Sequence, residues 1–172
     1  MTALFRRLLL LRHGQAGHPQ DVRDYDRPLS PEGENEADEV GTYLSQENLL
    51  PALALVSGSQ RTRATWSRVQ RALPEVVSAI FDDRIYEARS STLRDVLRGV
   101  LSEPPTLLLV GHNPGLHRLA LELIGRGGQT AYGRLTQELP PAGLVVIDFE
   151  VAGWGGISDQ GGALERFVTP KK

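Results

Sequence analysis

The 172-residue sequence contains no cysteine. This absence excludes disulfide bonds, cysteine nucleophiles and zinc sites with thiolate ligands, and it fits a reducing compartment. Long apolar runs are also missing, because no stretch approaches the roughly 18 apolar residues that cross a bilayer. The run at residues 8–11, which follows the N-terminal charges, is too short for a signal peptide. We therefore expect a cytoplasmic protein that is not embedded in a membrane.

An excess of charge of one sign is equally absent. The 19 basic and 21 acidic side chains give a formal net charge of -2, so no overall positive field would attract nucleic acid or an anionic membrane. Any anion site must be local. Hydrophobic residues make up 40% of the chain, and its length suits one compact domain over residues 1–172.

Motifs for metals and nucleotide cofactors are missing as well. The histidines are His13, His18, His112 and His117. The last two are five positions apart, whereas a spacing of four would place metal ligands on one helical face. The sequence has no Walker loop, no Rossmann glycine fingerprint after a strand and no nucleophile-elbow serine. We predict neither a metal nor a cofactor.

What the chain does contain is a set of short apolar runs with helical stretches between them. The runs lie at residues 8–11, 53–56, 107–110 and 144–147, with a weaker one at 76–81. Apolar residues without alternation indicate strands buried on both faces, as in a parallel sheet. The glycine-rich segment 153–162 predicts a turn or hairpin loop, and residues 164–168 an edge strand.

The first helix should begin at Ser30, Pro31 and Glu32, which supply a hydroxyl N-cap, an N1 proline and an acidic first turn. Further helices are predicted at residues 61–73, 91–101 and 115–124. Strands that alternate with helices predict a three-layer α/β/α sandwich with a mostly parallel central sheet and right-handed crossovers.

Unusual polar residues follow three of the predicted strands. Arg12 and His13 follow the first run, Arg61 lies shortly after the second, and His112 follows the run at 107–110. Open α/β sheets bind ligands beyond the carboxyl ends of their strands, so these two histidines and two arginines should share one rim. Guanidinium forks match phosphate oxygens, and a neutral imidazole can attack phosphorus in line. The pattern predicts a phosphoryl-transfer site.

Four ordered segments resemble the histidine phosphatase superfamily, also called phosphoglycerate-mutase-like. They are Leu11-Arg12-His13-Gly14-Gln15, residues 27–33, residues 57–65 and Gly111-His112-Asn113. The resemblance implies a phosphoglycerate-mutase-like fold and a phosphatase that forms a covalent phosphohistidine without a metal. Carried over, it makes His13 the nucleophile, Arg12 and Arg61 phosphate clamps, and His112 a second phosphate contact. It also implies that Gln15 and Asn113 contact the substrate at the rim.

The resemblance further assigns Glu87 as the proton donor to the leaving group, since many members place an acid after the second arginine. Small phosphohistidine phosphatases of the family often lack that acid, and a leaving imidazole needs little help. The mechanism therefore does not depend on Glu87.

About 18 residues separate Glu87 from the next predicted strand at Thr106, which leaves room for one helix and no large lid. An open, shallow site suits phosphohistidine on a protein substrate, and the chain resembles the small SixA-type phosphohistidine phosphatases. Three alternatives remain: a phosphatase for small phosphoesters, a mutase of the phosphoglycerate type, and a non-catalytic module that binds phosphorylated protein. Retention of His13 and both arginines argues against the last, and a mutase would need substrate clamps that this chain lacks.

Overall fold

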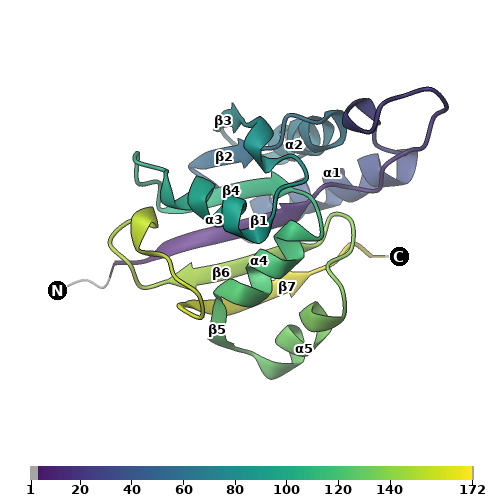
Figure 1. The fold of residues 1–172 in the computed structure, drawn as a ribbon. Helices are drawn as coiled ribbons and strands as arrows, with labels where there is room; N and C mark the ends of the chain where they lie inside the picture. The colour runs from purple at the N-terminus through teal and green to yellow at the C-terminus, as the bar shows by residue number, and fades with distance from the viewer. Residues whose placement is uncertain (1–3, 172) are drawn as a thin grey trace.

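The computed structural model describes residues 4–171, which form a seven-stranded sheet in the order β3-β2-β4-β1-β6-β7-β5 (Figure 1). The strands are β1 (Arg6–Arg12), β2 (Leu53–Val56), β3 (Ser78–Phe81), β4 (Thr106–Gly111), β5 (Ile124–Gly127), β6 (Leu144–Phe149) and β7 (Gly162–Val168). The helices are α1 (Pro31–Gln46), α2 (Gln60–Ala72), α3 (Ser90–Arg98), α4 (Gly115–Leu123) and α5 (Gln129–Gln137). Short 3-10 helices are η1 (Asp24–Asp26), η2 (Asp83–Ile85) and η3 (Trp154–Gly156).

The strands β3, β2, β4 and β1 are parallel neighbours, so their carboxyl ends meet at one edge of the sheet. β6 pairs antiparallel with β1, β7 pairs antiparallel with β6, and β5 pairs parallel with β7. The apolar run of β6 therefore lies in an antiparallel strand, although its pattern equals that of the parallel ones. A continuous apolar run reports burial of both faces and carries no information on strand direction.

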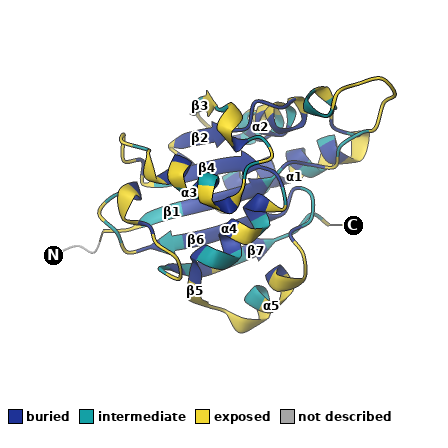
Figure 2. Ribbon diagram, viewed as in Figure 1, coloured by how far each residue is buried: buried dark blue, intermediate teal, exposed yellow. Residues whose placement is uncertain are grey.

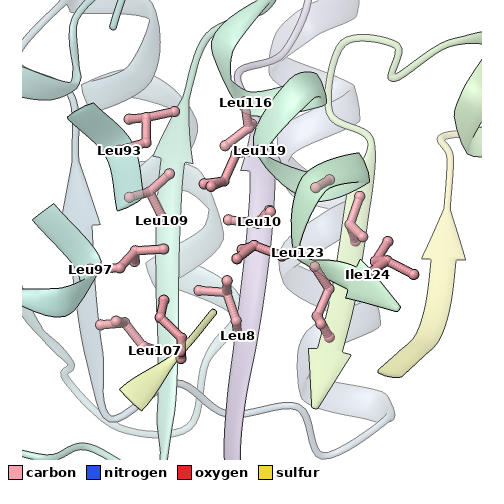
Figure 3. Close-up of a cluster of buried hydrophobic side chains, with 14 of the residues drawn as sticks. Leu8, Leu10, Leu93, Leu97, Leu107, Leu109, Leu116, Leu119, Leu123 and Ile124 are labelled. Carbon is pink, nitrogen blue, oxygen red and sulfur yellow. The ribbon is translucent and has the colours of Figure 1, made fainter. Parts of the chain in front are cut away.

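Helices cover both faces of the sheet, which confirms the three-layer α/β/α architecture (Figure 2). Leu8 and Leu10 of β1 pack with α3 and α4, as Figure 3 shows for that face. Leu9 and Leu11 pack on the opposite face with α1 and α2. All four leucines have no solvent exposure. Alternate side chains of a strand point to opposite faces, so one short apolar run contributes to both cores.

The predicted start of the first helix is confirmed. Ser30 Oγ accepts a hydrogen bond from the backbone N–H of Gly33 at 3.0 Å, and Pro31 is the first helical residue. This cap fixes where the chain leaves the loop that follows β1.

The last third of the chain departs from the sequence prediction. β5 and α5 were not predicted, and β7 is not an edge strand because β5 pairs along its outer side. β5 reads Ile-Gly-Arg-Gly, a composition without strand propensity, so pairing with β7 makes it extended.

Two predicted helices end earlier than expected. The helix predicted at 91–101 ends at Arg98, and the one predicted at 115–124 ends at Leu123. Within residues 4–171, no helix combines the length and apolarity that a membrane crossing requires.

Candidate active site

The loops after β1, β2 and β4 bring the predicted histidines and arginines together. The ring centroids of His13 and His112 are 5.2 Å apart, and Arg61 Nη2 lies 3.4 Å from His112 Nδ1. Arg12 immediately precedes His13 at the end of β1, and its positive charge contributes to lowering the pKa of both histidines. We call the side chains of Arg12, His13, Arg61 and His112 the cradle. Parallel neighbours β2, β4 and β1 create it by ending side by side.

The tautomer of His13 follows from the hydrogen bond that its ring forms with the backbone. Its Nδ1 lies 2.7 Å from the carbonyl oxygen of Gly14, and because a carbonyl oxygen only accepts, Nδ1 carries the proton. The lone pair is therefore on Nε2. Burial, and next to it the charge of Arg61, lowers the pKa of His13 to about 4, so its imidazole is neutral near pH 7. This is the state that a nucleophilic imidazole needs.

His112 is held from both sides of its ring. An Arg61 guanidinium N–H faces Nδ1, so Nδ1 accepts, and Nε2 then donates to Ser57 Oγ at 2.8 Å. Burial and the charges of the cradle lower the pKa of His112 to about 3. Ser57 comes from the loop after β2, and the sequence analysis assigned it no role. Its fully buried hydroxyl orients the second histidine.

Arg12 has an N–H donor that is not used within the described residues. Its Nη1 donates to the Leu139 carbonyl at 3.1 Å, while its buried Nε has no hydrogen-bond partner among residues 4–171. Burial lowers the pKa of Arg12, yet a guanidinium stays charged at neutral pH. Asn113 Nδ2 donates to the same Leu139 carbonyl at 2.8 Å, so the amide and the guanidinium share one anchor.

Gly14 allows a close backbone contact of a kind that the sequence did not reveal. A Cβ at this position would lie 2.5 Å from the carbonyl oxygen of Gly33, in the first turn of α1. The Gly14 N–H donates to Thr65 Oγ1 at 3.1 Å, which ties the loop after β1 to α2. The glycine therefore lets the loop that carries His13 lie against two helices.

Arg61 has an anionic partner that sequence reasoning missed. Its Nη1 donates to the backbone carbonyl of Asp24 at 2.6 Å, and its Nη2 donates to Asp24 Oδ2 at 3.0 Å. Tyr86 donates its hydroxyl proton to the same Oδ2, and Arg27 Nη1 donates to Oδ1 at 2.9 Å. These donors, the Tyr86 hydroxyl first, hold the pKa of Asp24 far below its usual range. No sequence pattern distinguishes Asp24, because it lies among several acidic residues between the first predicted strand and helix.

Two of the predicted residues point elsewhere or lie farther out. The Gln15 side chain is exposed and accepts from Ser30 Oγ at 2.8 Å, at the start of α1. Glu87 is exposed, follows Tyr86 directly and has a positive φ of 49°. Within the part of the chain that the structure describes, no hydrogen bond joins Glu87 to the cradle. Its charge does contribute to raising the pKa of Tyr86 to about 12, after burial and the Asp24 contact.

Comparison with known proteins places this geometry in a family. The model of the histidine phosphatase superfamily (branch 1) matches residues 8–94, about half of the chain, including His13 and Arg61. An uncharacterized protein of Mycobacterium tuberculosis, Rv1276c, is 32% identical over 164 residues, which cover 94% of this chain and 100% of that protein.

Two solved structures share the fold over nearly their whole length. A protein of Nakamurella multipartitia, provisionally named phosphohistidine phosphatase SixA, has a TM-score of 0.81 and 25% identity, with 98% of each chain covered. A protein of Agrobacterium tumefaciens, provisionally given the same name, has a TM-score of 0.79 and 30% identity, with 96% of this chain and 99% of that one covered. The family match extends from β1 through the start of α3 and contains the segments that hold the first three cradle residues. The chain therefore belongs to the histidine phosphatase superfamily, branch 1, and is a phosphatase.

Proposed function

We propose that this phosphatase hydrolyses phosphohistidine on protein substrates, and that His13 Nε2 carries the phosphoryl group between the substrate and water. The observation that carries the proposal is the state of His13 inside the cradle. Its Nδ1 proton is engaged by the Gly14 carbonyl, its Nε2 lone pair is free to attack, and two guanidinium groups lie beside it. A neutral nucleophile next to fixed cations is what transfer of an anionic phosphoryl group requires.

In the first step, Nε2 forms a bond to phosphorus while the P–N bond of the substrate breaks. Arg12 and Arg61 stabilise the charge on the equatorial oxygens, and the unpartnered Nε–H of Arg12 supplies one donor for them. The departing imidazole leaves neutral if its ring already holds a proton. Where the ring holds none, we assign the donor role to Glu87, which lies on the loop beside Tyr86.

In the second step, water attacks phosphorus and the P–Nε2 bond breaks. Because Gly14 keeps the Nδ1 proton in place, the phosphorylated ring of His13 is a cation. It therefore leaves as the neutral imidazole that began the cycle, and both protons of water go with the phosphate as dihydrogen phosphate. His112 lies on the second side of the cradle, where Ser57 holds its Nε2 and its Nδ1 faces Arg61, so we assign it the role of orienting that guanidinium toward the phosphoryl group.

The surroundings of the cradle favour a phosphoryl group presented on a protein. Between Glu87 and β4 the chain forms only α3, as the short spacing predicted, and α3 packs on the sheet with α4. The cradle therefore has only this short segment after Glu87 on that side, which leaves it accessible to a phosphoryl group carried by another protein.

A substrate panel tests the proposal. The specificity constant kcat/KM is measured for a protein phosphorylated on histidine, for p-nitrophenyl phosphate and for 3-phosphoglycerate. We expect the phosphohistidine protein to exceed the small phosphoesters by at least about 100-fold, because contacts outside the phosphoryl group strengthen transition-state binding. A preference for either small phosphoester would reject the proposed substrate class.

Trapping of the intermediate tests the chemistry. Quenching a reaction with radiolabelled substrate in alkaline detergent should give an alkali-stable, acid-labile phosphoenzyme in the wild type and none in His13→Ala. His18→Ala serves as the matched control, because His18 is exposed on the same loop. Undiminished turnover in His13→Ala would exclude His13 as the nucleophile.

A further inference from the structure

The Asp24 carboxylate occupies a position that a bound anion would also favour. Its Oδ2 accepts from Arg61 Nη2 at 3.0 Å and from the Tyr86 hydroxyl, two donors from different elements that converge on one oxygen. The same Arg61 nitrogen lies 3.4 Å from His112 Nδ1. A single nitrogen of Arg61 therefore contacts both Asp24 Oδ2 and the ring of His112, and that ring lies against His13.

Arg61 has little freedom to serve two anions at once. Its side chain is only 6% exposed, and both of its terminal nitrogens already donate to Asp24. A phosphoryl group that is gripped by a guanidinium fork needs two of its N–H donors in fixed directions. A carboxylate beside a phosphoryl dianion would also repel it strongly, since both charges are poorly screened next to a buried site.

The Asp24 carboxylate is placed where it can move away from Arg61 and Tyr86. Its side chain is 41% exposed, and it lies in η1 on the loop between β1 and α1, directly after the exposed segment 18–23 (Figure 2). The base of this loop is fixed by the bridge between Ala16 and Leu29. Rotation of the Asp24 side chain breaks the Oδ1 contact with Arg27, but the backbone contact with Arg61 Nη1 does not involve the carboxylate and remains. Such a rotation frees both donors at Oδ2 without moving the backbone.

We propose that Asp24 Oδ2 marks the position of one phosphoryl oxygen, and that this oxygen displaces Asp24 and accepts the hydrogen bonds of Arg61 and Tyr86. Before substrate binds, Asp24 keeps the Arg61 guanidinium oriented. After binding, Tyr86 becomes a phosphate contact that the sequence did not predict. The inference rests on the proposed function only in that the cradle must bind a phosphoryl group.

The test is the affinity for inorganic phosphate, measured by isothermal titration calorimetry at one pH and ionic strength. Asp24→Asn keeps the shape of the side chain but removes the competing charge, so we expect the dissociation constant to fall about tenfold. Asp24→Ser, which removes the competing group further, should bind phosphate at least as tightly. The control is Asp26→Asn, because Asp26 lies on the same 3-10 helix and, among residues 4–171, forms its ion pair with exposed Arg23 alone. It should leave the dissociation constant unchanged.

A second substitution separates displacement from simple support of Arg61. In the wild type, Tyr86→Phe should change phosphate affinity less than about twofold, because the hydroxyl loses an anionic partner in both the free and the bound state. In the Asp24→Asn background the same change should weaken phosphate binding at least about tenfold, the value of one lost hydrogen bond to an anion.

Unchanged or weaker phosphate binding in both Asp24 variants, with thermal unfolding that shows them folded, would overturn the inference. Asp24 would then only support Arg61. The outcome is independent of the substrate panel: an enzyme that prefers small phosphoesters would reject the proposed substrate and leave this comparison valid. If neither the wild type nor the variants bind phosphate, both this inference and the proposed phosphoryl-binding role of the cradle are rejected.

Discussion

The protonation of His13 is the property on which phosphoryl transfer depends most directly, and pH is the perturbation that tests it. Burial is the largest cause that lowers the pKa of His13 to about 4, against an ordinary value of 6.5. At pH 5 an ordinary histidine is only about 3% neutral, whereas His13 should be about 90% neutral. An unperturbed nucleophile would therefore lose about 30-fold in rate between pH 8 and pH 5. His13 should lose almost nothing over that range.

The direct assay is an NMR titration of protein labelled with ¹³C-histidine, from pH 8 down to the onset of acid unfolding. The His13 resonance is assigned by its loss in His13→Gln. We expect its chemical shift to stay constant through pH 6.5 and to begin to move only near pH 5. Parallel kcat/KM profiles, corrected for substrate ionisation by ³¹P titration, should show no inflection from His13 near 6.5. A His13 midpoint close to 6.5 would refute the argument from burial.

Arg61→Gln distinguishes burial from charge as the cause. Burial is the largest cause, and Arg61 is only one of three nearby cations, so its removal should raise the pKa of His13 by less than about one unit. A return to an ordinary value in this variant would mean that charge, not burial, sets the protonation of His13.

The same shift makes stability depend on pH in a defined direction. Between pH 6.5 and about 4, the unfolded chain binds a proton at His13 that the folded chain does not, so the free energy of unfolding falls as pH falls. The contribution is absent above pH 6.5 and reaches about 3 kcal/mol below pH 4. In His13→Gln, denaturant unfolding should lose this part of the acid destabilisation.

Two further substitutions test residues around the cradle. Ser57→Ala removes the buried partner that holds His112 Nε2 at 2.8 Å, so kcat/KM should fall about fivefold to tenfold, as expected for one hydrogen bond. Exposed Ser102→Ala should have no effect, and an equal loss in both would assign the change to something other than the tether. Glu87→Gln should reduce hydrolysis of 3-phosphoglycerate about 100-fold but that of phosphohistidine less than tenfold, because an alkoxide leaving group needs a proton donor and an imidazole that already holds a proton does not. Equal losses on the two substrates would argue against Glu87 as the leaving-group acid.

The position of the cradle was predictable from sequence because it depends on local patterns. Apolar runs of four residues placed three strands, and the residues after them had to lie on one rim once the strands were parallel neighbours. These patterns alone predict that Arg12, His13, Arg61 and His112 lie on that rim. The N-cap at Ser30 was readable for a similar reason, since capping uses residues within one turn.

Tertiary structure decided what depends on contacts between distant segments. Asp24 bonds to Arg61 across 37 positions of sequence, Ser57 bonds to His112 across 55, and Tyr86 bonds to Asp24 across 62. No local pattern encodes such contacts. β5 is extended only because β7 lies beside it. The low pKa of His13 comes from burial, which the whole fold creates. Sequence determined which chemical groups meet at the edge of the sheet, and packing determined their protonation and their partners, because both depend on distances that only the folded chain sets.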